Sequence, residues 1–164
     1  MKYKRFEELP VWQAAIQLAV EMYAMTAKAE FRRQHSLRDQ IGRATVSVSN
    51  NIAEGFERGT NNELLSFLYI ARGSAGEVRS MLCLLQRIPI FLNLESETRN
   101  LKEKAESISK QLGAWIQSIL NSNLKGQPFV TDKTRLAQTA AEDPRKFLEE
   151  LQRIREAGQI AQTK

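Results

Sequence analysis

Few side chains in this sequence have the type and spacing that enzyme chemistry requires. The 164 residues contain one histidine, His35, and one cysteine, Cys83. A di-metal centre in a helical bundle needs Glu-x-x-His pairs, but Arg32 stands three residues before His35. A single cysteine also excludes an internal disulfide and a cysteine-built zinc site. We therefore expect no catalytic residue, no metal site and no cofactor.

A serine flanked by small residues, at positions 72–76 (Arg-Gly-Ser-Ala-Gly), superficially resembles the nucleophile elbow of hydrolases. The glycine two residues before the serine is missing, and the segment lies within a helical pattern instead of a strand-to-helix turn. Small side chains that let a neighbouring helix approach closely are the better explanation. Such a contact would offset the cost of about 1 kcal/mol that each glycine adds inside a helix.

A polar stripe along the second predicted helix is the most distinctive set of residues. If the hairpin turns near residue 60, facing positions have numbers that sum to about 120. This places Arg43 opposite Glu77, and Ser47 opposite Gly73. We expect a half-buried polar network that sets the helix register, with an Arg43–Glu77 ion pair; ordinary solvated side chains are the alternative. The network residues are Arg43, Ser47, Asn51, Glu54, Arg58 and Glu77.

Four basic residues around the first helix connection are the candidates for contact with nucleic acid: Lys28, Arg32, Arg33 and Arg38. The whole chain has 24 basic and 19 acidic side chains, a net charge of +5. This excess permits an anionic partner without requiring one. The common nucleic-acid-binding motifs are missing, so a solvated basic loop is the alternative.

Apolar residues recur with helical periodicity in four segments, which must position the residues above. We predict four helices, over residues 10–28, 37–57, 61–88 and 94–121. Ser36 suits the N-cap of the second helix, and Thr60 or Asn61 that of the third. No segment alternates with period two over the length of a strand. The predicted fold class is all-α, an antiparallel up-down-up-down four-helix bundle with a C-terminal extension.

The chain divides into a bundle of residues 1–122 and an extension of residues 123–164. The extension begins with glycine, proline and polar residues that are typical of a linker. Asp143 and Pro144 suit the N-cap and first turn of a short amphipathic helix. A disordered tail is the alternative for this segment.

The first helix has more apolar residues than one core-facing stripe, about three positions in seven, requires. One stripe holds Trp12, Ile16, Ala19 and Tyr23, and a second one beside it holds Val11, Leu18, Met22 and Met25. A monomer would leave one stripe in water, so we expect an oligomer interface. Its candidate residues are Val11, Leu18, Met22, Met25, Gly73, Ser74 and Gly76.

No membrane segment is expected. No apolar run has the length of a bilayer-spanning helix, and acids follow the basic N-terminal residues where a signal peptide would have an apolar stretch. We therefore predict a cytoplasmic protein with no membrane partner.

Three motifs together resemble one known family. They are Phe6-x-x-Leu9-x-Val11-Trp12-Gln13, then Gln40-Ile41-x-Arg43-Ala44 with Asn51-Ile52-Ala53-Glu54-Gly55, then Ile70-Ala71-x-Gly73-Ser74-x-x-Glu77. The family is the four-helix-bundle proteins encoded in intervening sequences of bacterial 23S ribosomal RNA genes, sometimes labelled S23 ribosomal protein. The resemblance covers residues 6 to 120.

The resemblance implies a homopentameric ring and kinship in fold with the accessory variability proteins of diversity-generating retroelements. Those pentamers bind nucleic acid and associate with a reverse transcriptase. The resemblance implies no enzyme activity. It implies that the residues at the matching motif positions are structural or interface residues: Arg43, Asn51, Glu54, Gly55, Gly73, Ser74 and Glu77. The expected function is a non-enzymatic homo-oligomeric scaffold, preferably a pentamer, that binds RNA or DNA or a nucleoprotein partner. The alternative is an accessory subunit that docks a reverse transcriptase.

The chain departs from the family pattern in two helix positions and one connection. Gly42 stands where the family often has a second basic residue, and Ser49 where it often has proline. The first connection has Ala29-Glu30 and Arg32-Arg33 in place of the Phe-Pro pair and acids that the family often has. These changes make the connection more basic, which favours an anionic partner.

Overall fold

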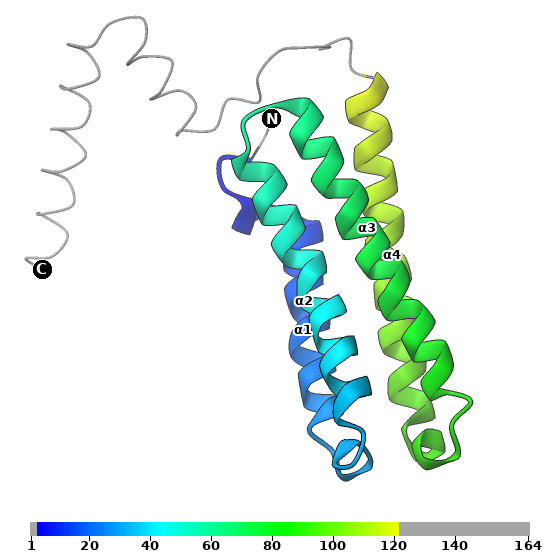
Figure 1. Cartoon of the computed structure of the whole chain (residues 1–164). Coiled ribbons are helices and arrows are strands. Elements are labelled where there is room, and N and C mark those ends of the chain that lie inside the picture. The colour runs from blue at the N-terminus through cyan, green and yellow to red at the C-terminus, as the bar shows by residue number, and fades with distance from the viewer. Residues whose placement is uncertain (1–2, 122–164) are drawn as a thin grey trace, which may run out of the picture.

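The structure, a computed structural model, describes residues 3–121. Four long helices run up and down in one bundle (Figure 1). They are α1 (Pro10–Thr26), α2 (His35–Glu57), α3 (Asn61–Leu85) and α4 (Glu95–Asn121). Three short 3-10 helices precede or connect them: η1 (Phe6–Glu8), η2 (Ala29–Phe31) and η3 (Pro89–Leu94). No strand occurs in residues 3–121, and the predicted all-α four-helix fold is confirmed.

The ends of the helices differ slightly from the prediction. α2 begins at His35, so this histidine belongs to the helix and not to the preceding loop. Its N-cap is Gln34, which makes no side-chain capping bond, and the prediction of Ser36 as N-cap is wrong. The N-cap of α3 is Thr60, whose hydroxyl accepts a bond from the backbone N–H of Glu63 at 3.2 Å, as predicted. The predicted linker, short helix or tail at 123–164 lies outside the described residues.

The core is one continuous apolar cluster to which all four helices contribute. On α1 the stripe of Val11, Leu18, Met22 and Met25 faces this core, and none of the four side chains is more than 7% exposed. The prediction that these residues form an oligomer interface is therefore wrong. The surplus stripe of α1 is the other one, since Trp12, Ile16 and Tyr23 remain partly or largely exposed and only Ala19 is buried.

The α1–α2 and α3–α4 connections lie at the same end of the bundle, which we call the loop end (residues 27–34 and 86–94; bottom of Figure 1). Phe31 and Phe91, one from each connection, are buried with their ring centroids 4.6 Å apart. The Asn93 amide donates to the Glu30 carboxylate, and this hydrogen bond lowers the pKa of Glu30. The two connections therefore hold each other in place.

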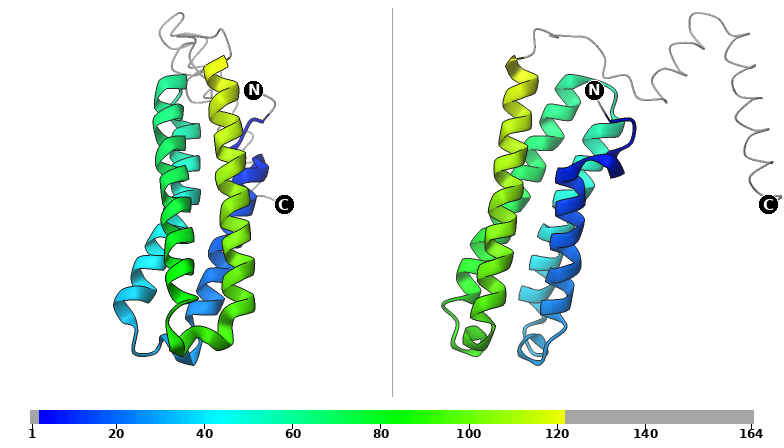
Figure 2. Two further views of the ribbon diagram at one scale, coloured as in Figure 1. Left: turned by 90° about the vertical axis from the view of Figure 1, so that its right-hand side faces the viewer. Right: turned by 180° about the vertical axis from the view of Figure 1, so that it is seen from behind.

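α1 and α4 close the bundle, and Figure 2 shows them side by side from behind. Lys104 Nζ lies 2.6 Å from Glu21 Oε2, and this hydrogen bond is the main cause of the lowered pKa of Glu21. Nearer the loop end, Lys28 Nζ lies 2.6 and 2.7 Å from the two carboxylate oxygens of Glu97. These two pairs fix the alignment of α1 along α4.

α2 and α3 approach each other closely near their connecting turn. A Cβ atom on Gly55 would lie 2.7 Å from Cβ of Phe67, closer than real side chains pack, so glycine is required for this approach. Gly59 follows the end of α2 with a φ of 78°, a conformation that glycine adopts without steric cost. The two glycines therefore set the spacing and the sharpness of the α2–α3 hairpin.

Candidate nucleic-acid interface

The four basic residues predicted to contact nucleic acid lie at or beside the loop end, but their surroundings differ. Lys28 is held by Glu97, and Nε of Arg38 lies 3.3 Å from Oδ1 of Asp39. Arg32 and Arg33 are exposed, and neither forms an ion pair within the part of the chain that the structure describes. Arg32 and Arg33 are therefore the most available cations of the four.

Arg43 is also exposed, about two turns into α2 from its start. The predicted half-buried Arg43–Glu77 ion pair is wrong: both side chains are exposed, and no ion pair joins them in residues 3–121. Instead, Nε2 of Gln40 donates to the Glu77 carboxylate at 3.4 Å. The reason is helix rotation, because a residue three positions along lies about 60° further around the helix. Gln40 points to the α3 seam, and Arg43 is turned outward.

Part of the predicted polar network lies in the α2–α3 seam. The hydroxyls of Ser47 and Ser74 are 2.9 Å apart, and Nδ2 of Asn51 donates to the carbonyl and the hydroxyl of Ser47 at 2.7 and 2.9 Å. All three side chains are partly buried. Polar groups matched across a seam favour one register of the two helices over its neighbours. We assign these residues to the fold and not to ligand binding.

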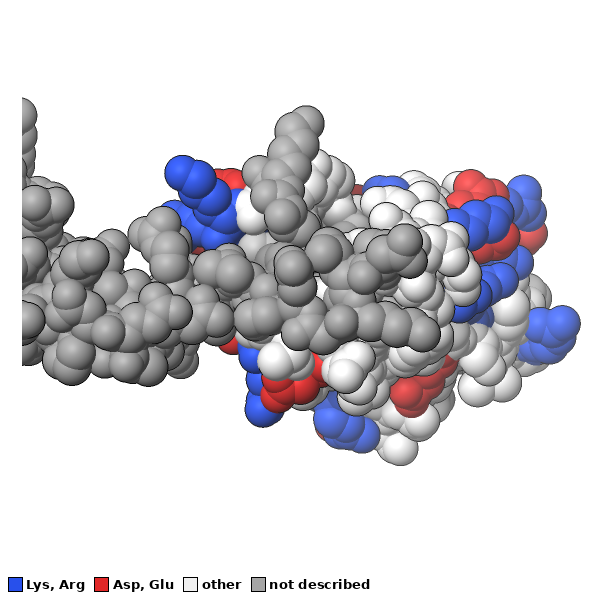
Figure 3. Space-filling view, turned by 90° about the horizontal axis from the view of Figure 1, so that it is seen from above, with Lys and Arg blue, Asp and Glu red and all other residues white. Residues whose placement is uncertain are grey.

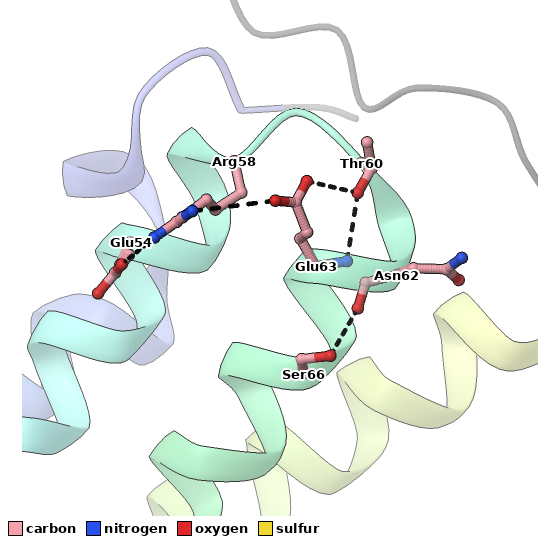
Figure 4. Close-up of polar contacts among 6 residues, drawn as sticks. All are labelled: Glu54, Arg58, Thr60, Asn62, Glu63 and Ser66. Atoms are coloured by element: carbon pink, nitrogen blue, oxygen red, sulfur yellow. Dashed lines mark hydrogen bonds and ion pairs between the residues drawn. The ribbon is translucent and has the colours of Figure 1, made fainter.

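Glu54 and Arg58 belong to a separate, exposed cluster at the α2–α3 turn (Figure 4). The Arg58 guanidinium lies 2.6 Å from Glu54 and 4.0 Å from Glu63, and Glu63 accepts a bond from Thr60. These contacts raise the pKa of Arg58, chiefly through the bond to Glu54. This end of the molecule is shown from above in Figure 3, where basic and acidic groups stand next to each other. Arg58 at this turn is paired with two glutamates, whereas Arg32 and Arg33 at the loop end are not paired in residues 3–121.

A shallow depression of about 500 Å³ lies between the last turn of α1 and the first half of α2. Tyr23, whose side chain is 56% exposed, lies against Gly42: a Cβ added there would be 3.6 Å from the Tyr23 hydroxyl. A residue with a longer side chain at 42 would enter the space beside the ring. The lining residues are Tyr23, Thr26, Ala27, Arg38, Asp39, Gly42 and Arg43. Sequence analysis missed this site, although the departure from the family pattern at Gly42 was a signal.

A family model described as 23S rRNA-intervening sequence protein matches residues 7–114. The chain belongs to this family. The match extends from η1 into α4, so it includes the loop end, the depression and the α2–α3 seam. A search of curated proteins found no match. The 23S rRNA-intervening sequence proteins are not a known enzyme family.

This member of the 23S rRNA-intervening sequence protein family has exposed apolar side chains on two separate helices. Ile16 and Val20 are exposed on α1, and Ile70 and Leu84 on α3. Gly73 and Gly76 lie on the outer side of α3, and no atom outside the local helix comes within 4 Å of a Cβ placed on either. The expectation that Ser47 packs closely against Gly73 is therefore wrong, since Ser47 contacts Ser74 instead.

Residues 3–121 of this family member contain no group of three or more histidine, cysteine, aspartate or glutamate side chains that could hold a metal ion. Within the same range, no helix has the length and hydropathy needed to cross a bilayer. Cys83 is a free, half-buried thiol.

Proposed function

We propose that this protein is a non-enzymatic, homo-oligomeric scaffold that binds RNA or DNA through its loop end. The observation that carries the proposal is a group of exposed arginines at the loop end and on the adjoining part of α2: Arg32, Arg33 and Arg43 form no ion pair in residues 3–121. An unpaired guanidinium keeps all its donors for phosphate oxygens and has no carboxylate partner to give up. Elsewhere in residues 3–121, a glutamate lies within 4.0 Å of each of Arg5, Arg58, Arg79 and Arg99, and Arg72 on α3 is the exception that forms no ion pair.

The backbone at the start of α2 also adds positive potential to the loop end. α2 begins at the loop end without a side-chain cap, so its first N–H groups add partial positive charge there. The Glu30 carboxylate is bound by Asn93 and the Glu97 carboxylate by Lys28. The Lys28–Glu97 pair is neutral as a whole, whereas Glu30 keeps its negative charge beside the neutral Asn93 amide. Arg32 and Arg33 outnumber this one acid in the first connection.

Removing two of these cations should weaken binding. In the double variant Arg32→Gln/Arg33→Gln, we expect affinity for a 20-nucleotide RNA to fall roughly tenfold or more in moderate salt. The slope of log Kd against log salt should become shallower by about 1.4, because each lost phosphate contact removes about 0.7 on a single strand. Fluorescence anisotropy across a salt series measures both quantities.

A matched control lowers the net charge by the same two units at other places. In Arg5→Gln/Lys110→Gln, both altered residues are exposed and lie away from the loop end. This double variant should keep the affinity and the salt slope. Equal losses in the two double variants would mean that only net charge matters, and binding that is insensitive to salt would favour a protein partner.

The oligomeric part of the proposal rests on the two exposed apolar faces. A ring of like subunits needs one face of each copy against a different face of the next. We assign Ile16 and Val20 on α1 to one face, and Ile70, Gly73 and Gly76 on α3 to the other. Glycines with open space beyond them let a second helix approach closely. The family resemblance makes five the preferred number of copies.

The expected mass in solution is a multiple of the 18.7 kDa chain mass, and five times that mass if the ring is a pentamer. Replacing Ile70 with glutamate places a charge in the proposed contact, so Ile70→Glu should give the mass of one chain. Leu92→Glu, which alters an equally exposed side chain at the loop end, should keep the parental mass. Light scattering at micromolar concentration decides this, and a parental protein of one chain mass would contradict the scaffold.

A further inference from the structure

We propose that the depression between α1 and α2 holds one unpaired guanine base of a single-stranded nucleic acid. Tyr23 would stack on the base, Asp39 would accept its hydrogen bonds, and Arg43 would contact an adjoining phosphate. The proposal rests on the proposed function and deepens it, because it names the strand type and the base that the loop end selects.

Tyr23 is the side chain that points to a base. It stands in the surplus apolar stripe of α1, yet it is 56% exposed and lines the depression together with Arg38 and Arg43. Aromatic rings exposed next to guanidinium groups are the usual surface on which single-stranded bases stack. The contact assigned to the oligomer uses Ile16 and Val20, which lie about two turns and one turn before Tyr23 on α1, and it does not include the Tyr23 ring.

Gly42 keeps the space beside the ring open. Its Cβ position lies 3.6 to 3.9 Å from three atoms of the Tyr23 ring and hydroxyl. Atoms beyond Cβ would therefore crowd the Tyr23 ring and the depression that both residues line. The volume of about 500 Å³ is large enough for one base with part of its backbone, but it is not large enough for a duplex.

Asp39 separates this site from a simple phosphate-binding patch. A carboxylate among arginines repels phosphate, so a patch that bound only phosphate would be better without it. A carboxylate can instead accept two hydrogen bonds from the N1–H and N2–H₂ donors along one edge of guanine. Its present partner, Nε of Arg38 at 3.3 Å, holds it in an exposed ion pair that contributes little to stability and opens readily.

The test uses the full chain and two labelled eight-nucleotide RNAs, one of uridines alone and one with a single central guanosine. We expect the guanosine-containing strand to bind more tightly than the uridine strand, and both to bind more tightly than a duplex. Tyr23→Leu should weaken binding of the guanosine strand roughly tenfold with an unchanged salt slope, since stacking is lost and phosphate contacts remain. Tyr23→Phe retains the ring and should bind as the parent does.

Asp39→Asn should have two opposite effects. The preference for guanosine should fall, because an amide cannot accept two bonds from that edge, and affinity for the uridine strand should rise, because phosphate repulsion is removed. Glu103→Gln, which removes an exposed acid from α4, should change neither quantity. Circular dichroism and light scattering check that each variant keeps the fold and mass of the parent.

The outcomes separate the two proposals. If Tyr23→Leu binds like the parent, or if duplex and single strands bind equally, the base site is overturned while nucleic-acid binding by Arg32 and Arg33 stands. If the parent binds no nucleic acid at low salt, the proposed function fails and the base site falls with it. A salt slope that changes in Tyr23→Leu would assign Tyr23 to positioning the arginines and would also overturn stacking.

Discussion

Replacing Phe31 with alanine should lower the free energy of unfolding by about 3–5 kcal/mol, the usual cost of removing a buried phenylalanine. The ring is fully buried, and its centroid is 4.6 Å from that of Phe91. It anchors the α1–α2 connection to the α3–α4 connection, so the cavity would open where two loops meet. Loops cannot shift to fill such a cavity without losing the Asn93–Glu30 hydrogen bond.

Denaturant-induced unfolding followed by circular dichroism measures this loss. Leu92→Ala is the matched control, since Leu92 lies in the same connection as Phe91 but is 57% exposed. It should change the free energy of unfolding by no more than about 0.5 kcal/mol. A loss below about 1 kcal/mol in Phe31→Ala would show that the two connections do not depend on this contact.

Two glycine-to-alanine substitutions should have opposite effects on stability. Gly55→Ala would place Cβ 2.7 Å from Cβ of Phe67, so α2 and α3 must separate, and overpacking of this kind costs about 1–3 kcal/mol. Gly73→Ala meets nothing within 4 Å and should stabilise the chain by up to about 1 kcal/mol, because alanine is the better helix former.

These free energies should be measured in the Ile70→Glu background, so that self-association does not contribute. Each substitution adds the same methyl group inside a long helix, and therefore each serves as the control for the other. If Gly73→Ala destabilised the monomer as much as Gly55→Ala did, helix spacing would not explain the requirement for glycine at 55.

The four helices could be predicted because their apolar residues recur with a clear helical period. The start of α2 could not be predicted, since it depends on tertiary contacts. Phe31 is held in the core, and this fixes where the chain turns upward. The helix therefore begins at His35, immediately after the turn, although Ser36 has the better capping side chain.

Periodicity also could not show which of the two apolar stripes of α1 faces the core. Both stripes have helical spacing, and they are separated by a small rotation of the helix. The stripe with Leu18 and Met22 is buried, and the stripe with Tyr23 is outside. The phenol of tyrosine favours a place where its hydroxyl can reach water, and this preference was the available signal.

The candidate site depends on the same kind of small rotation. The hairpin register was predicted within one residue, since Ser47 meets Ser74 instead of Gly73. The rotation of residues about the α2 axis, and not this step in register, turns Gln40 toward Glu77 and leaves Arg43 facing the depression. Pairing residues by their numbers does not show which residue within a helical turn faces the neighbouring helix. The charge that faces the proposed ligand depends on that choice.

Because the bundle has four antiparallel helices, α1 begins and α4 ends at the same end of the molecule. This matters for any assay that attaches the protein to a dye or a surface. The first described residues and the end of α4 lie at the end of the bundle opposite the loop end (Figure 1). α4 alone has 27 residues, which at a rise of 1.5 Å per residue gives a length of about 40 Å. A fluorophore or an immobilising tag coupled near Tyr3 would leave Arg32 and Arg33 facing the solution. Energy transfer from that position would report a ligand arriving at the far end of the molecule.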